Sequence, residues 1–288
     1  MSFHRTPAVL TSTQPDRPRS SRGGPVGLLL LFLFNLAWGG FPAISHDKAS
    51  GDALSYYALA VNLSEGEGFT RDYKSDPATP ETEPPFSNQG RFLYPYLVSL
   101  ALPVAGKTIE TANFVAALFR ALLVIPLVLI TWHLFDDGAA GWAVGLLYTF
   151  NPVYLALGTI AMPETTTAAF YYLGILCFLY YGQTARGPWL LLGGTAASLS
   201  YLARPEGLLL VLLGLLTLAV GPRRPRDAAY LLFFPLLTLT AGSLLIYGKA
   251  GNVSPYQTSL TTLPDWADYY VLGGWTLSES LDRVGGMW

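Results

Sequence analysis

Asp52 is the residue of this chain best placed to do chemistry, because its carboxylate opens a short helical pattern between two apolar runs. Apolar residues that include Leu54, Ala58 and Val61 recur after it at helical spacing, and the Gly66–Gly68 pair follows. The pattern predicts an amphipathic helix on a membrane surface, which begins at Asp52 and ends at the glycines. Carboxylates act as general bases in enzymes, but an acid at a helix start also has an ordinary role as an N-cap. The residue alone does not decide between the two roles.

The elements that must hold this helix are apolar. Of the 288 residues, 51% are hydrophobic and only 12% are charged, about half the usual share for a soluble globular protein. The 17 basic and 19 acidic residues leave no basic field, which argues against a nucleic-acid-binding protein. The single cysteine, Cys177, excludes a disulfide framework and a thiolate metal site. We therefore predict an all-α integral membrane protein.

Seven apolar runs are long enough, or nearly long enough, for the roughly 20 residues that a crossing needs. They are Val26–Ile44, Phe114–Phe135, Ala139–Met162, Thr165–Tyr181, Pro188–Ala203, Gly207–Val220 and Ala228–Tyr247. The first run also resembles a signal peptide, although it is longer than a normal one and follows a long polar leader. The fifth and sixth runs could form one broken helix, but together they are about twice the length of one crossing. We interpret them as two spans.

The remaining segments complete the predicted topology. Residues 1–25 form a disordered cytoplasmic leader, residues 26–248 the membrane module and residues 249–288 a short extracytoplasmic tail. Residues 45–110 form a long first outer loop. Within this loop residues 92–106 are apolar but short and contain two prolines, so we predict an interfacial or re-entrant segment.

The charges orient these spans. With the N-terminus inside, the inner segments carry eight basic and four acidic residues, whereas the longer outer segments carry eight basic and fifteen acidic ones. This distribution follows the positive-inside rule. We expect a plasma-membrane protein of a prokaryote with a cytoplasmic N-terminus.

The loop sequence GDALSYYALAVNLSEGEGF resembles the first-loop signature of GT-C glycosyltransferases, which include protein O-mannosyltransferases and aminoarabinose transferases. Further similar features follow in order over about residues 26–250. They are Pro84-Pro85, Arg91 with Tyr94-Pro95, Asn151-Pro152, Glu164 in MPETT, and LARPEGLLL at Leu202–Leu210. The resemblance implies a membrane enzyme that moves a sugar from a polyprenyl-phosphate donor to an acceptor at the extracytoplasmic face.

The same resemblance assigns roles to individual residues. Asp52 would be the general base that takes the proton of the acceptor hydroxyl, and Glu164 would be a second acid in the site. Because a phosphate leaves, the inverting reaction needs positive charge on that phosphate and no general acid. Ordinary explanations remain open, since Glu164 also suits the start of a helix.

Three arginines are candidates to bind the lipid phosphate. Arg204 could also pair with Glu206 or extend to the interface. Arg120 lies within a predicted span, where a charge is costly unless it is functional. Arg91 is the third candidate. Some relatives bind a divalent cation with first-loop acids, so a metal at Asp47 and Asp52 is left open.

Two departures from the family pattern affect the prediction. No basic residue adjoins Pro84-Pro85, and the chain stops at Trp288 without a further acceptor-binding domain, so a partner polypeptide could supply acceptor recognition. The alternative functions are a non-catalytic subunit that binds lipid carriers, or a transporter or flippase. A transporter should place polar groups near the membrane midplane, whereas the acids here gather at the outer ends of the spans.

Overall fold

The computed structural model describes residues 24–45, 51–68, 91–220 and 226–233, and all regular structure in these ranges is helical. The elements are α1 (Gly24–Ser45), α2 (Asp52–Glu65), α3 (Leu93–Ala105), α4 (Ile109–Phe135), α5 (Gly138–Phe150), α6 (Pro152–Leu157), α7 (Glu164–Thr184), α8 (Gly187–Ala203), the 3₁₀ turn η1 (Pro205–Gly207) and α9 (Leu208–Val220). A further helical segment covers residues 226–233.

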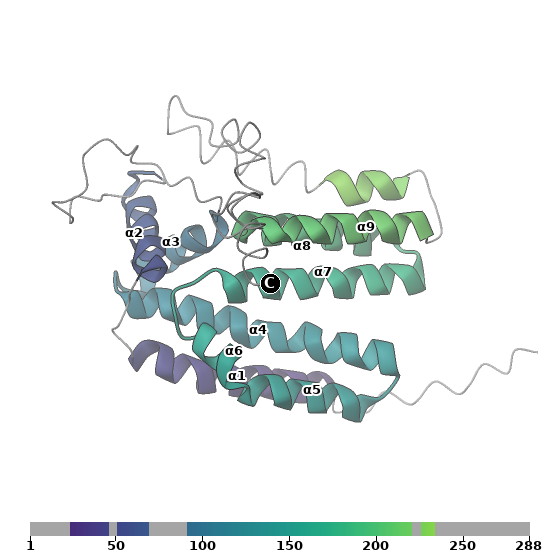
Figure 1. Cartoon of the computed structure of the whole chain (residues 1–288), viewed down its shortest axis with the longest axis horizontal. Coiled ribbons are helices and arrows are strands. Elements are labelled where there is room, and N and C mark those ends of the chain that lie inside the picture. Colours follow the sequence, from purple (N-terminus) through teal and green to yellow (C-terminus); the bar gives the residue numbers. More distant parts are fainter. Residues whose placement is uncertain (1–23, 46–50, 69–90, 221–225, 234–288) are drawn as a thin grey trace, which may run out of the picture.

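The long helices lie side by side in a bundle, and α2 and α3 cross its one end (Figure 1). Helix α4 is central, since it contacts α1 and α5 on one side and α7 on the other, while α8 packs on α7 and α9 follows (Figure 1). Two of the described helices, α1 and α4, are long and apolar enough to cross a membrane. Helices α3 and α5 and the segment Pro205–Val220 are apolar but shorter.

The observed helices refine the predicted spans. Helix α4 begins at Ile109, five residues before the predicted start, because Thr108 caps it and accepts from the Thr111 N–H at 3.4 Å. The run over residues 139–162 is not one helix. It breaks at Asn151, because the following Pro152 disfavours the α conformation at the residue before it. The Asn151 side chain then caps α6. Of the run over residues 228–247, only residues up to 233 lie within the described ranges.

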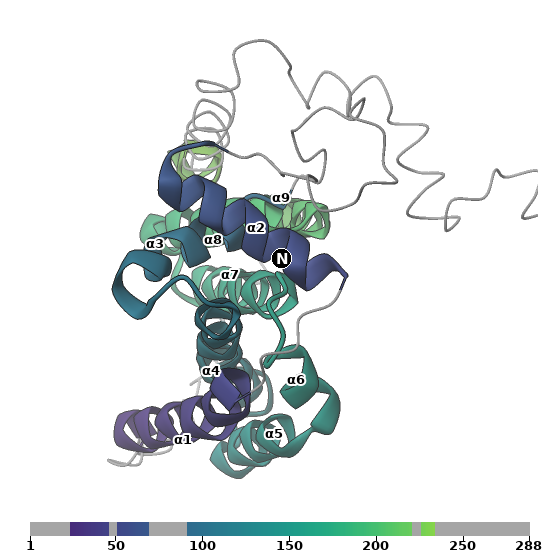
Figure 2. The ribbon, with the colours of Figure 1, turned by 90° about the vertical axis from the view of Figure 1, so that its left-hand side faces the viewer.

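Helices α2 and α3 form a small layer at one end of the bundle. The helix predicted at Asp52 is present, and Gly66 ends it in the left-handed region at φ 82°, which glycine adopts without strain. Tyr56 and Leu59 of α2 share a buried cluster with Tyr94 and Val98 of α3, which also packs on α4. The segment predicted to be interfacial or re-entrant is a helix that packs on α2, α4 and α8 with one side buried and its last residues exposed. It lies beside α2 rather than along the bundle (Figure 2), and its place relative to the membrane interface stays a prediction.

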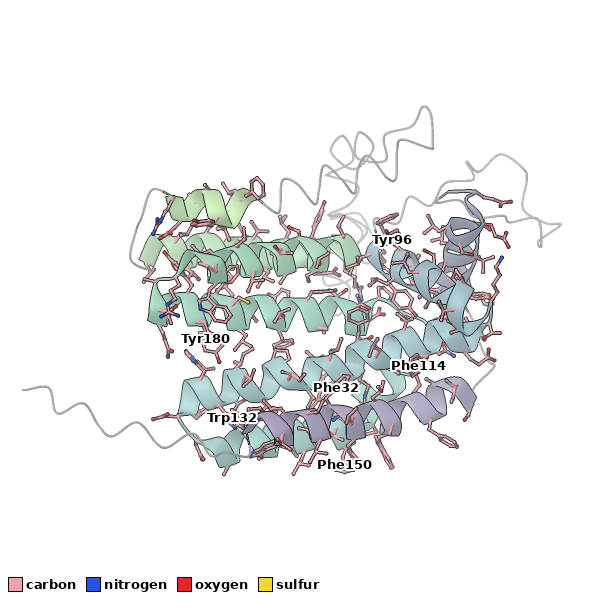
Figure 3. The ribbon with its side chains drawn as sticks, turned by 180° about the vertical axis from the view of Figure 1, so that it is seen from behind. Phe32, Tyr96, Phe114, Trp132, Phe150 and Tyr180 are labelled. Carbon is pink, nitrogen blue, oxygen red and sulfur yellow. The ribbon has the colours of Figure 1, made fainter. Side chains whose placement is uncertain are left out.

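Small residues let α5 approach α4 and α1 closely. A Cβ atom at Gly141 would lie 1.9 Å from the Trp132 ring, and one at Gly145 would lie 2.8 Å from Leu31 and Val128 side chains. The two glycines are four residues apart, which is the spacing of small residues at which membrane helices often pack closely. In Figure 3 Trp132 and Tyr180 lie toward the end of the bundle opposite Tyr96.

Candidate functional site

Four of the predicted site residues, Asp52, Arg91, Glu164 and Arg204, lie at the end of the bundle that carries α2 and α3, where Asp52 pairs with Arg91 and Glu164 with Arg204. Asp52 begins α2, Arg91 precedes α3, Glu164 begins α7 and Arg204 follows α8. Since α3 contacts α4 and α8, and α4 contacts α7, packing brings these chain segments to one place. The structure therefore unites residues that are up to 152 positions apart in the sequence.

Asp52 makes an ion pair rather than a helix cap. The N-cap residue of α2 is Gly51, at φ 56°, and none of the hydrogen bonds between described residues joins the Asp52 side chain to the helix start. Its Oδ2 instead lies 3.8 Å from Nη1 of Arg91, and the Asp52 side chain is 53% exposed. Such a long and exposed ion pair stabilises the fold little, by about 0–1 kcal/mol. Because the Asp52 side chain is half exposed, its carboxylate is accessible to a ligand.

Arg91 connects Asp52 to Tyr56, one turn further along α2. The Arg91 side chain is 12% exposed, its Nη1 donates to the Tyr56 hydroxyl, and its guanidinium lies 5.9 Å from the Tyr56 ring centroid. Tyr56 is fully buried. Burial raises its pKa above the ordinary value, Arg91 lowers the pKa in part, and the charges of Asp52 and Glu164 raise it further. Both carboxylates therefore act on the same phenol.

Tyr94 fixes the position of this group against α4. Its hydroxyl donates to the Ala112 carbonyl at 2.8 Å, and its ring packs edge-on against Tyr56 with centroids 6.1 Å apart. Burial raises the pKa of Tyr94 well above its ordinary value, with a smaller contribution from the charge of Glu164. Neither tyrosine was among the predicted site residues. Their spacing offered a signal for Tyr56, because it lies four residues after Asp52 and so on the same helix face.

Glu164 and Arg204 form the second ion pair of this end. Oε1 of Glu164 lies 2.7 Å from Nη1 of Arg204, and both side chains are about three-quarters buried. Arg204 also lies 3.4 Å from the more exposed Glu206, as the sequence suggested. Two buried atoms of the main pair, Glu164 Oε2 and Arg204 Nε, have no hydrogen-bond partner among the described residues. Buried polar atoms are usually satisfied, so this pair retains capacity to bind a ligand.

Arg120 lies away from this group. It is fully buried in α4, and its three guanidinium nitrogens donate to backbone carbonyls: Nε to Tyr154 at 3.1 Å, Nη2 to Thr149 at 2.8 Å and Nη1 to Asn35 at 3.4 Å. The structure thus brings Arg91 and Arg204 to the carboxylates but not Arg120. The positive charge of Arg120 serves helices α1, α5 and α6 instead.

The described residues contain no group of three or more His, Cys, Asp or Glu side chains that could hold a metal ion. Near Asp52 the described charged neighbour is a cation, Arg91. Asp47 and the Pro84-Pro85 segment lie outside the described residues. The divalent cation that the resemblance left open at Asp47 and Asp52 stays a prediction.

Comparison with known proteins gives one match. Residues 88–247, more than half of the chain, match the family model described as dolichyl-phosphate-mannose-protein mannosyltransferase. The matched range includes Arg91, Arg120, Glu164 and Arg204, whereas Asp52 and Tyr56 precede it. No curated protein and no solved structure matches the chain.

Proposed function

Because the chain belongs to the dolichyl-phosphate-mannose-protein mannosyltransferase family, a GT-C family whose members use lipid-phosphate-linked sugars, we propose that it transfers a sugar from a polyprenyl phosphate to an acceptor hydroxyl at the α2–α3 end of the bundle. In this proposal Asp52 is the general base and Arg204 binds the phosphate. The observation that carries it is the meeting of two carboxylate–arginine pairs at one end of the bundle.

The two pairs differ in ways that suit two roles. Asp52 is half exposed and its ion pair with Arg91 is long, so an acceptor hydroxyl can approach the carboxylate. Arg91 and Tyr56 then hold the carboxylate in place from the buried side. Glu164 and Arg204 are more buried, where a charge interacts more strongly than in water. We assign the exposed pair to the acceptor and the buried pair to the donor phosphate.

The chemical step needs one base and one cation. The acceptor oxygen attacks the anomeric carbon and forms the new glycosidic bond while its proton passes to Asp52. The bond between the anomeric carbon and the phosphate oxygen breaks, and the polyprenyl phosphate leaves with the electron pair. Its charge is neutralised by Arg204, whose Nε has no other partner among the described residues. Glu164 keeps Arg204 oriented before the donor binds.

Polyprenyl-phosphate sugars of several kinds are the probes that test this function. Purified protein in lipid nanodiscs is assayed with a panel of such donors, beside Asp52→Asn and the control Glu65→Gln. Glu65 is an exposed acid at the other end of α2 and pairs with Lys107 at 2.7 Å. Loss of the base should lower turnover by about 10²–10⁴-fold, with Glu65→Gln unaffected. Undiminished turnover in Asp52→Asn, or binding of donor without turnover in the parent, would contradict the proposal; the second result favours a lipid-carrier-binding subunit.

We also propose that this end faces the extracytoplasmic side, with seven spans in all. The basic residues concentrated in the short segments of the opposite end support this orientation. Cysteines replace Glu65 at the α2 end and Arg186 at the opposite end, in a Cys177→Ala background. A membrane-impermeant maleimide should label the first from outside intact cells and the second only after lysis. Labelling of both from outside would contradict the topology.

A further inference from the structure

Arg120 is an intramembrane cation whose described partners are all backbone oxygens. It lies in α4, fully buried, and its guanidinium reaches three carbonyls on separate parts of the chain, those of Asn35, Thr149 and Tyr154. The ring of Tyr148 lies 5.6 Å from its guanidinium carbon, and the Tyr148 hydroxyl donates to the Arg120 carbonyl at 2.9 Å. Burying a charge among helices is costly, so an arrangement this specific calls for a function.

The helix break at Asn151 explains the need for these donors. Where α5 ends, its last carbonyls lose their partners within the helix, and Pro152 has no N–H to offer. Inside a membrane no bulk water replaces them. Nη2 of Arg120 donates to the Thr149 carbonyl in the last turn of α5. Its Nε donates to the Tyr154 carbonyl in α6, which also accepts from the Gly158 N–H, so one side chain binds both sides of the break.

The segment that follows this break ends at Glu164. Residues 158–163 lead from α6 to α7, and their far end is fixed by Thr165, whose hydroxyl donates to the Ala116 carbonyl at 3.0 Å. Ala116 and Arg120 are one turn apart on α4 and so lie on the same face. That face of α4 therefore holds both ends of the connection, Arg120 at its beginning and Ala116 at its end.

We propose that Arg120 is a positioning residue for Glu164: by closing the α5–α6 break it fixes the connection that places the Glu164 carboxylate against Arg204. This inference rests on the proposed function of Glu164 and Arg204. It assigns Arg120 a role through the backbone in place of the contact with the lipid phosphate that the sequence suggested.

Close packing holds the guanidinium in this position. A Cβ atom at Gly158 would lie 2.2 Å from Cδ of Arg120, and one at Gly39 would lie 2.7 Å from Nη1. The two glycines therefore clear the space that the arginine occupies, Gly158 beside its aliphatic stem and Gly39 beside its guanidinium. Arg120 cannot swing toward a ligand at the bundle end without losing its three hydrogen bonds to carbonyls, and the loss of each bond has a cost.

Kinetics distinguish positioning from phosphate binding. Arg120→Gln and Arg120→Lys are compared with the parent and with Arg186→Gln, a cation at the opposite end. Both Arg120 variants should lose roughly 10- to 100-fold in kcat, because small displacements of a reacting geometry are costly, while KM for the polyprenyl-phosphate sugar stays within about twofold. Lysine should not rescue, since a point charge cannot bond three separated carbonyls, whereas it would serve a phosphate. A rise in KM that lysine reverses would overturn the proposal.

A cross-link reports the position of α7 without any substrate. In a Cys177→Ala background, cysteines replace Ala116 and Thr165, whose contact ends the connection. A reference pair replaces Phe178 and Gly193, which pack together between α7 and α8 nearer the other end. Arg120→Gln should reduce the first cross-link several-fold and leave the second unchanged. Gly158→Val, which displaces the same break while keeping the charge, should do likewise.

The two proposals fail in different ways. An unchanged Ala116–Thr165 cross-link, or a lost cross-link with full turnover, would overturn the role of Arg120. Loss of both cross-links would show that the variant is unfolded, and Gly158→Val then decides the question. A parent that turns over no donor would count against the proposed function, and the cross-link would still test whether Arg120 positions α7.

Discussion

The two ends of the helical bundle satisfy their polar side chains in different ways. At the α2–α3 end, the arginines bond to partners 35 and 40 residues away in the chain. At the opposite end, Asp137 accepts from the Ala139 N–H, two residues on, and the Trp132 indole donates to the Gly138 carbonyl, six residues on. One longer contact occurs there as well, from the buried Tyr181 hydroxyl to Asp227 at 2.6 Å.

This difference separates polar groups that end helices from groups that remain for a ligand. A cap is complete once its few backbone donors are satisfied, so it leaves nothing over. The ion pair of Glu164 and Arg204 is different from these caps, because each member keeps a buried polar atom without a partner among the described residues. At the opposite end the Oδ1 atom of the buried Asp227 also has no such partner, so the contrast holds between this ion pair and the caps. Substitutions of the ion pair should therefore affect turnover, and substitutions of a cap should affect stability.

Arg204→Met should have the largest effect of this set. It removes the cation assigned to the donor phosphate and leaves Glu164 partly buried without its partner. We expect kcat/KM to fall by about 10²–10³-fold, as for the loss of one donor to a developing negative charge. The matched control is Lys107→Met, an exposed cation at the same end that pairs with Glu65. An equal fall in kcat/KM in both variants would mean that the positive charge at this end of the bundle acts as a whole, and that Arg204 has no specific role.

Arg91→Gln should have an intermediate effect. It removes the ion pair to Asp52 and the donor to Tyr56, so the proposed base loses its orientation but remains present. We expect about a tenfold fall in kcat, with KM for the donor unchanged, measured on the same nanodisc preparation. A rise in donor KM would instead assign Arg91 to the lipid phosphate, as the sequence resemblance suggested.

Much of the architecture could be predicted because it depends on local pattern. The low charge and the apolar runs indicated a helical membrane protein, and family membership confirms an integral membrane protein of a GT-C family. The helix from Asp52 to the glycines was also predictable, because the residues that start and end it, Asp52 and Gly66, lie in one short stretch of the sequence. The number of spans stays a prediction.

The contacts between distant segments could not be predicted, because they depend on how the helices pack. The sequence suggested Glu206 as the partner of Arg204, but in the structure Glu164, forty residues away in the chain, lies closer to it. Arg120 looked like a candidate for a ligand because its acceptors are backbone carbonyls, which every residue carries and no sequence pattern marks. Pro152 indicates the helix break at Asn151, but no sequence pattern indicates the hydrogen bonds that Arg120 of α4 makes across it.

Asp137→Ala tests the opposite end of the comparison. It removes the side chain that caps α5, where Oδ1 accepts from the Ala139 N–H at 2.8 Å. The free energy of unfolding should fall by about 1 kcal/mol, read as a lower unfolding temperature in detergent, with turnover kept. Asp137→Asn, which preserves a capping oxygen, should restore stability. A large loss of turnover in Asp137→Ala would contradict the division between the two ends.

Tyr56→Phe should have a small effect on the free energy of unfolding, and the size of this effect should fall at high pH. The substitution removes the acceptor for Arg91, so near neutral pH the variant should be less stable by about 1 kcal/mol.

Burial raises the pKa of Tyr56 in the folded protein, so as pH rises above about 10 the unfolded wild type loses this proton first. Only the wild type has this proton, so its free energy of unfolding should fall relative to that of the variant between about pH 9 and 11. Because the other tyrosines are common to both proteins, the difference in unfolding temperature isolates Tyr56. A gap that stays constant or widens over this range would mean that the Tyr56 hydroxyl is not held in its protonated form between α2 and Arg91.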